Sequence, residues 1–184
     1  MRLRMAGLLL LLGLALALPA EDYGIVIREA KVTAHEQDLI VSADVEYAFN
    51  PAALEALENG VPLTLLVEFT LERERALWFN ETILEERRSI QIRYHPLAKS
   101  YQVADLSSGA IQSFASLSAV KDTLSRIRGW RLTQSWRLDK TLPYLATLRL
   151  KLDIEALPLP LRAVAYLSPQ WRFASPTLSW RVEP

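Results

Sequence analysis

The side chains that most often catalyse reactions are scarce in this sequence. It has two histidines, His35 and His95, which lie far apart in the chain and next to turn residues. A histidine base needs a nucleophile within reach and an acid that orients the ring, and no serine lies in a recognisable nucleophile turn. The chain has no cysteine, which excludes thiol catalysis, disulfides and cysteine-ligated zinc. The sequence therefore predicts no catalytic residue.

Paired carboxylates are the remaining groups that could do chemistry. Glu72 and Glu74, and likewise Glu85 and Glu86, are close in sequence, and a glycosidase-type hydrolase needs two acids at one cleft. Their spacing is that of solvated charges on a strand or helix surface. No His/Asp spacing resembles a metal-ligand set, and the six glycines do not form a phosphate-binding loop. We expect no metal, no cofactor and no enzymatic activity.

A Trp-Arg pair recurs four times in the last third of the chain. Adjacent residues on a strand point to opposite faces, so the pairs predict tryptophans in the core and arginines outside. A second interpretation is a positive face that binds an acidic protein, lipid head groups or an anionic glycan, because Trp and Arg are enriched at binding hot spots. The tryptophans are Trp130, Trp136, Trp171 and Trp180, and the candidate partner surface consists of Arg128, Arg131, Arg137, Arg172 and Arg181.

Charge is unevenly distributed along a chain whose formal net charge is zero. Residues 21–125 carry 9 basic and 17 acidic side chains, and residues 126–184 carry 10 basic and 4 acidic ones. Such asymmetry is typical of chains that bind an anionic partner. It also arises when strands from the two halves are neighbours in a sheet and their charges pair locally, which is the interpretation we prefer.

The N-terminus has the layout of a secretory signal peptide over residues 1–20. Arg2 and Arg4 precede an unbroken apolar stretch over 6–18, and Pro19 and Ala20 come before the first acids. The stretch is shorter than the roughly 20 residues of a membrane-spanning helix. We expect cleavage, export to the periplasm, no stable membrane span and no contact with nucleic acid. The alternative is an uncleaved segment that anchors the protein to the inner membrane.

Most of the remaining chain alternates between apolar and polar side chains, which is typical of strands with one buried face. The clearest case is 38–49, where the apolar residues share one parity and Ser42, Asp44 and Glu46 share the other. Residues 78–83 either extend a neighbouring strand or form another. The pattern predicts further strands over 24–33, 61–72, 89–94, 100–103, 111–114, 130–138, 144–154 and 171–182, the last interrupted by Pro176.

Two short helices separate these strands. Asn50 is a good N-cap, Pro51 suits the first helical position, and Asn59-Gly60 end the first helix. Residues 116–128 have apolar side chains at helical spacing before Gly129. Because a sheet of alternating strands cannot cover its own apolar face, we predict one mainly β domain over 21–184. Its expected fold is an antiparallel two-sheet sandwich of about eight or nine strands, with a half-open β-barrel as the alternative.

The run Leu157-Pro158-Leu159-Pro160-Leu161 cannot be a central strand, because proline lacks the backbone donor. Alternating Leu and Pro favour an extended, polyproline-like chain. We interpret the run as a crossover packed on the edge of the sandwich, since apolar side chains on a wet loop would form an exposed patch. A docking segment is the alternative.

The sequence from Leu157 to Arg172, LPLPLRAVAYLSPQWR, resembles the closing signature of an uncharacterised family of exported proteobacterial proteins, domain of unknown function 4390. The Trp78 region, Gly129-Trp130-Arg131 and the Ser168-Pro169-x-Trp171 motif follow the order of that family. The family has no assigned activity, so the resemblance implies no functional residue. It implies a gene setting beside a membrane sensor kinase of the nitrogen-regulation type, and hence an accessory role at the periplasmic face of that kinase.

These observations favour a non-enzymatic periplasmic binding or accessory module that contacts a membrane protein or an envelope component. The sequence identifies neither the specific partner of this module nor its oligomeric state. One alternative is a carrier of a small apolar ligand, which needs a dry cavity of about 300 Å³ or more. The other alternative is a carboxylate-based hydrolase, which needs two acids that converge in a cleft.

Overall fold

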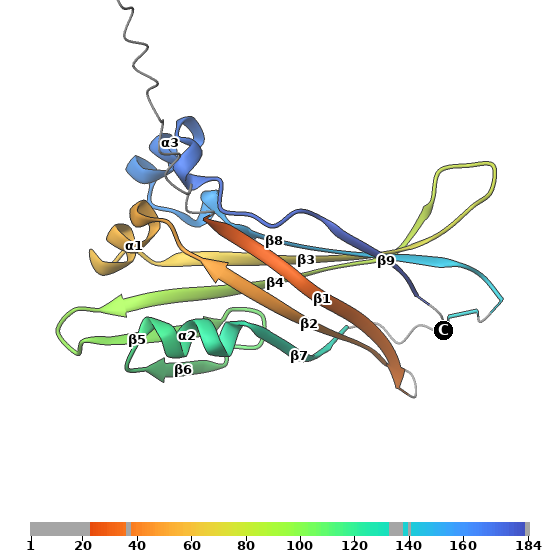
Figure 1. The fold of residues 1–184 in the computed structure, drawn as a ribbon, viewed down its shortest axis with the longest axis horizontal. Helices are drawn as coiled ribbons and strands as arrows, with labels where there is room; N and C mark the ends of the chain where they lie inside the picture. The colour runs from red at the N-terminus through yellow and green to blue at the C-terminus, as the bar shows by residue number, and fades with distance from the viewer. Residues whose placement is uncertain (1–22, 36–37, 133–137, 140, 183–184) are drawn as a thin grey trace, which may run out of the picture.

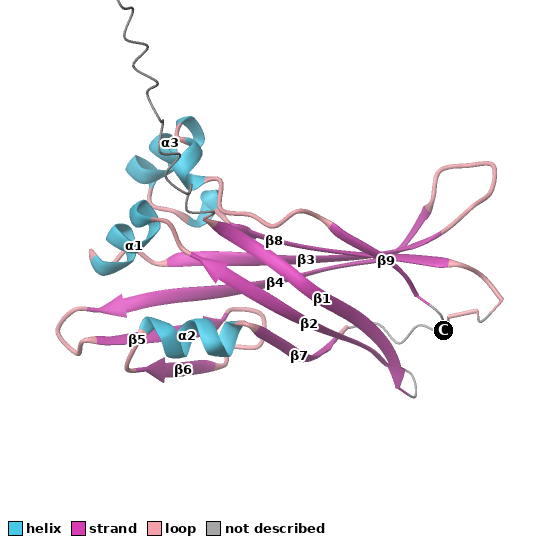
Figure 2. Ribbon diagram, in the orientation of Figure 1, coloured by secondary structure: helices cyan, strands magenta, loops and turns pink. Residues whose placement is uncertain are grey.

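The computed structural model describes residues 23–182 except 36–37, 133–137 and 140. The predicted signal peptide over 1–20 and the pair Trp136-Arg137 lie outside the described residues. Nine strands, three α-helices and two 3-10 helices make up the described part (Figures 1 and 2).

The strands form two antiparallel sheets that pack on each other as layers (Figure 1). The smaller sheet has the order β1-β2-β7, with β1 at Gly24–His35, β2 at Asp38–Ala48 and β7 at Arg126–Arg131. Its strands cross the larger sheet at an angle (Figure 1). The predicted two-sheet sandwich is thus confirmed, and within the described residues the sheets do not close into a barrel.

The larger sheet has six strands in the order β6-β5-β4-β3-β8-β9, and every neighbouring pair is antiparallel. Its central strand β3, from the acidic first part of the chain, pairs with β8 from the basic last part. The larger sheet consists of β3 (Leu63–Arg73), β4 (Glu81–His95), β5 (Ser100–Asp105), β6 (Ile111–Phe114), β8 (Tyr144–Leu152) and β9 (Leu178–Val182).

The core lies between the two sheets and is made by residues of one parity on each strand. The apolar residues predicted to share a face from Leu39 to Phe49 are all buried, as are those of β3 from Leu63 to Leu71. The ring of Phe69 on β3 lies 6.3 Å from that of Trp130 on β7 and 6.3 Å from that of Trp180 on β9. Phe69 therefore links the central strand of the larger sheet to an edge strand of each layer.

The first predicted helix is confirmed as α1 (Pro51–Glu58). The Asn50 side chain accepts a hydrogen bond from the Ala53 N–H at 2.8 Å, which is the predicted N-cap. Its amide also donates to the carbonyl of Gln170 in the 3-10 helix η2 (Pro169–Trp171). One buried asparagine thus joins two segments that are distant in sequence.

Three predicted elements are shorter in the structure. The helix predicted over 116–128 is α2 (Leu117–Leu124), and the strand β7 begins two residues later. Gly129 lies inside that strand with φ of +62°, which fits a β-bulge rather than the predicted helix stop. In the described residues the strand predicted over 130–138 ends at Arg131, and the last strand begins only at Leu178.

The extended, polyproline-like conformation expected for residues 157–161 is wrong, because a third helix, α3 (Leu159–Leu167), begins within them. Leu157 is buried after the 3-10 helix η1 (Ile154–Ala156). Pro158 is the N-cap of α3, and Pro160 lies in its first turn. Both prolines lack only N–H groups that a helix leaves free at its start, so they begin the helix instead of preventing it.

Replacing Phe69 by Ala is expected to destabilise the protein by about 3–5 kcal/mol, because it leaves a cavity between the two sheets. Urea unfolding followed by tryptophan fluorescence measures this change. Phe79→Ala removes the same side chain from an exposed loop position and is expected to change the free energy of unfolding by less than about 0.5 kcal/mol. Equal effects of the two substitutions would contradict the assigned core.

Candidate interaction surfaces

Two of the five candidate arginines lie on β7 and pair with acids of the neighbouring strand β2. Arg128 contacts Asp44, and the Nε of Arg131 lies 3.2 Å from Oδ2 of Asp38. Arg128 also donates to the carbonyl of Ala43 at 2.9 Å. Exposed pairs of this kind contribute up to about 1 kcal/mol each. At these positions, acids from the first part of the chain therefore pair with arginines from its last part on a neighbouring strand.

The other candidate arginines lie elsewhere. Arg181 on β9 places its Nε 3.4 Å from Oε2 of Glu74, which follows β3. Arg172 follows η2 and lines a depression of about 500 Å³ near α1. Arg137 lies outside the described residues. Arg128 and Arg131 thus share β7 but pair with acids six residues apart on β2, whereas Arg172 follows η2 and Arg181 lies on β9. A shared positive face for an anionic partner stays a prediction.

The tryptophans of the three described Trp-Arg pairs turn towards the interior. Trp171 is buried, and Trp130 and Trp180 are half-buried against Phe69. The arginine that follows each of them is exposed. For these pairs the arrangement agrees with the first interpretation of the sequence, in which tryptophans face the core and arginines face solvent.

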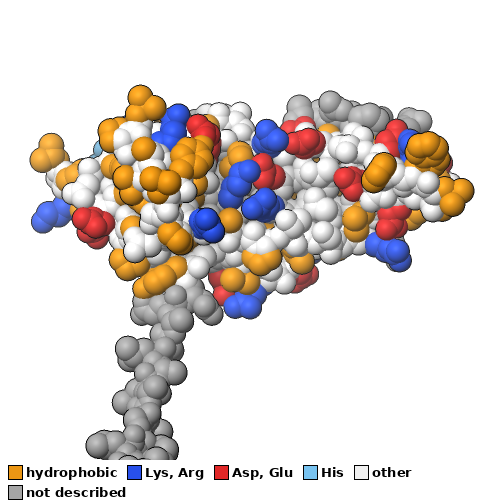
Figure 3. All heavy atoms as spheres, turned by 90° about the horizontal axis from the view of Figure 1, so that it is seen from above, with side chains coloured by type: hydrophobic (Ala, Val, Ile, Leu, Met, Phe, Trp, Pro, Cys, Tyr) orange, Lys and Arg blue, Asp and Glu red, His pale blue; other side chains and the backbone are white. Residues whose placement is uncertain are grey.

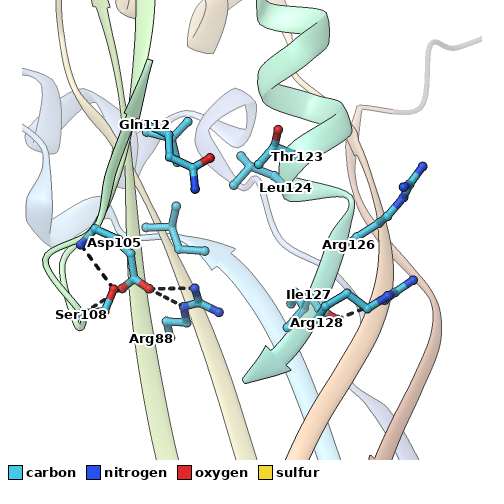
Figure 4. A pocket seen from close by; sticks show the side chains of 12 residues that line it. Arg88, Asp105, Ser108, Gln112, Thr123, Leu124, Arg126, Ile127 and Arg128 are labelled. Carbon is cyan, nitrogen blue, oxygen red and sulfur yellow. Dashed lines mark hydrogen bonds and ion pairs between the residues drawn. The ribbon is translucent and has the colours of Figure 1, made fainter. Parts of the chain in front are cut away.

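A cluster of polar side chains lines a depression of about 220 Å³ between β5, β7 and α2 (Figure 4). Arg88 donates from Nε to Oδ2 of Asp105 at 2.9 Å, and its Nη2 lies 2.7 Å from the same oxygen. The N–H groups of Ser107 and Ser108 donate to Oδ1 of Asp105 at 2.9 and 3.2 Å. Both carboxylate oxygens therefore have partners within the protein.

The ionisation of Asp105 follows from these contacts. Burial raises the pKa of Asp105, but hydrogen bonds from Arg88, Ser108 and the Ser107 N–H, together with the charge of Arg88, hold that pKa below its usual value. In Figure 4 the side chains of Arg126 and Arg128 point away from the depression. An acid that stays ionised and is saturated with donors is a poor general acid, and we interpret this pair as a structural link between β4 and the β5–β6 turn.

The carboxylate pairs noted in the sequence are also engaged by other side chains. Glu72 accepts a hydrogen bond from Asn80 at 3.1 Å, and Glu85 accepts one from Arg87 at 2.8 Å. None of these acids lines the depressions at Asp105 and at Asn50. In the described part of the chain, no group of three or more His, Cys, Asp or Glu residues is arranged to hold a metal ion.

The β3–β4 loop carries three consecutive large apolar side chains in solvent. Leu77, Trp78 and Phe79, hereafter the apolar tip, are 91%, 79% and 93% exposed. The loop projects beyond both sheets at one end of the molecule (Figure 1). Below it, Glu81 contacts both Arg73 and Arg75 across the hairpin. This surface was not predicted, although the three large apolar residues that follow the charged run 72–75 and Ala76 break the alternation.

A second apolar surface lies on α3, at the other end of the molecule (Figure 2). Leu159, Val164, Tyr166 and Leu167 are exposed there. Figure 3 shows apolar side chains gathered at both ends and charges of both signs between them. Among the described helices, none is both long and apolar enough to cross a bilayer.

The fold and these surfaces define an antiparallel two-sheet β protein that carries local charge pairs between its strands and exposed apolar side chains at both ends. Comparison with known families shows a match over residues 22–181 to the family described as "Domain of unknown function (DUF4390)". The chain therefore belongs to this family, as the resemblance of its C-terminal motifs implies. No curated protein and no solved structure matches it.

Asp105→Asn is expected to destabilise the protein by about 1 kcal/mol at pH 7, because Arg88 loses its partly buried charge partner. The folded-state pKa of Asp105 lies below the unfolded value, so its stabilisation is present above the unfolded pKa and is lost as the pH falls through the folded one. The difference between the two proteins should therefore shrink below about pH 4. Urea unfolding at neutral and acidic pH checks this. A difference that stays constant with pH would contradict the assigned ion pair.

Proposed function

We propose that the protein is an exported, non-enzymatic binding module that contacts a membrane protein or another envelope component through its apolar tip. The observation that carries this proposal is the exposure of Leu77, Trp78 and Phe79 on one projecting loop. Soluble proteins rarely keep large contiguous apolar patches in water, and such patches mark interaction sites. Aromatic residues are also the side chains most enriched at binding hot spots.

The paired strands β3 and β4 hold the apolar tip in place before any partner binds. β3 and β4 are paired from Leu63↔Ile92 to Arg73↔Glu81, with one bulge near Leu71. The contacts of Glu81 with Arg73 and Arg75 close the hairpin directly below the loop. A rigid arm loses little conformational entropy when it binds, which increases the affinity that a small contact can reach.

Export to the periplasm is part of the proposal and rests on the layout of residues 1–20. The gene setting that the family resemblance implies makes the periplasmic face of a membrane sensor kinase a suitable partner. That partner would bind the tip in an apolar pocket, since the tip itself is convex and carries no charge.

The alternatives have weaker support. An apolar-ligand carrier needs an enclosed dry cavity, whereas the depressions of about 220 and 500 Å³ are open to solvent and have polar as well as apolar linings. A hydrolase needs two acids that converge on one cleft, and the acid in the Asp105 depression is saturated by Arg88 and backbone donors.

The test is photo-crosslinking in living cells that produce the full chain with p-benzoylphenylalanine in place of Trp78. We expect a discrete adduct with an envelope protein. Adding Leu77→Ser and Phe79→Ser should lower its yield at least about tenfold, because each fully buried apolar side chain contributes about 1.5–3 kcal/mol. Electrophoresis and mass spectrometry of the adduct give the readout.

The matched control places the same photo-reactive group at Leu97, which is fully exposed on the β4–β5 turn. We expect no discrete adduct from that position. The tip substitutions should leave the free energy of unfolding within about 0.5 kcal/mol of the unmodified protein. Equal yields from positions 78 and 97, or a yield unaffected by the tip substitutions, would rule out the tip as the contact.

A further inference from the structure

We propose that the outward face of α3 rests on a lipid bilayer. This contact is distinct from the apolar tip and lies at the opposite end of the molecule. It shares with the function proposed above only the entry of residues 6–18 into a membrane. Three features of the molecule support it: the composition of the helix face, the hydrogen bonds of its one charged side chain, and the place where the N-terminal segment joins the described chain.

The outward face of α3 has no charged side chain. Leu167 is 87% exposed, Leu159 75%, Tyr166 57% and Val164 53%, while Ala165 on the inner side is buried. A surface helix normally presents charged and polar residues to water. The exposed residues of this face are Leu159, Pro160, Ala163, Val164, Tyr166 and Leu167.

The single charged side chain of α3, Arg162, points towards η1 and not towards the outward face. Arg162 places Nη1 3.2 Å from Oε2 of Glu155 and donates from Nη2 to the carbonyl of Leu157 at 3.1 Å. It also donates to the carbonyl of Glu155. The guanidinium is thereby bound to η1 and the start of α3, so it leaves the outward face apolar.

The N-terminal segment joins the described chain at this end. Tyr23 lines the same depression as Pro169, which begins η2 after α3, and Phe173, which follows η2. The apolar stretch 6–18 is separated from Tyr23 by residues 19–22 alone. The five steps from residue 18 to Tyr23 span at most about 18 Å. Whenever residues 6–18 enter a bilayer, during export or as an anchor, this end of the domain is held close to the lipid surface.

A bilayer fits the size and chemistry of the face better than a second copy of the chain does. A helix of nine residues is about 13–14 Å long, and one such face is far smaller than the roughly 800 Å² per partner of a stable protein interface. Interfacial helices bury an apolar face about 5–10 Å deep. Tyr166 suits the headgroup level, and Arg172, exposed beside η2, can meet lipid phosphates.

The experiment uses the full chain, which has no cysteine and accepts a single introduced one. Leu167→Cys is labelled with an NBD fluorophore and mixed with vesicles of equimolar phosphatidylethanolamine and phosphatidylglycerol. We expect a blue shift and a rise of NBD emission, and the loss of that rise when the vesicles contain acyl-chain spin-labelled lipid. Leu97→Cys carries the same label at an equally open position and should show neither change.

A second arm tests whether the helix face itself causes the signal. The label is placed at Leu159→Cys, and Leu167→Asp is added. We expect most of the emission rise to disappear, whereas adding Leu97→Asp instead should leave it unchanged. Because none of these positions lies in the apolar tip, this result is independent of crosslinking at Trp78.

Three results would overturn the proposal. The first is a probe at 167 that behaves like the probe at 97 although the chain floats with the vesicles. The second is a blue shift that grows with protein concentration and is not quenched by spin-labelled lipid, which would identify a second copy as the occupant. The third is a blue shift already complete without vesicles and independent of concentration, which would identify residues 6–18 of the same chain.

Discussion

Each sheet of this protein has one apolar face and can remove it from water only by covering the other sheet. Phe69 contributes to both parts of this contact. Its ring packs against Trp130 of the smaller sheet and against Trp180 at the edge of the larger sheet. In the registers of β3 with β4 and β8, residues that are paired across neighbouring strands point to the same face of the larger sheet. The apolar residues at the centre of that sheet therefore face the core together. The alternate side chains of these strands, which include the charged ones, therefore face outward.

Features encoded by local signals were predictable from the sequence. Strict alternation predicts β2, β3 and β8, because the side-chain period of a strand is two. The N-cap and first-turn proline predict α1, since Asn50 and Pro51 satisfy or avoid the free N–H groups of a helix start. The facing residues Tyr94 and Tyr101 of the β4–β5 hairpin likewise follow from a short turn between two alternating runs.

The remaining features depend on contacts between segments that are distant in sequence. The pairing of Arg128 with Asp44 requires β7 to lie beside β2, and no local pattern specifies that neighbour. The start of α3 was missed because Leu-Pro alternation also fits an extended chain, and the inward hydrogen bonds of Arg162 are visible only in the fold. The apolar tip was missed because Leu-Trp-Phe also fits a strand, and its exposure depends on how far the hairpin extends beyond its neighbours.

The long hairpin also fixes the distance between the two ends of the molecule. The 15 residues of β4 rise by about 3.4 Å each, or about 50 Å in total, and α3 and the β3–β4 loop lie towards opposite ends of that length (Figure 1). A paired strand cannot be compressed, so the spacing between the two apolar ends is set by counting residues. Two extra residues in both β3 and β4 would lengthen it by about 7 Å, whereas one extra residue in each would turn the core side chains beyond the insertion outward.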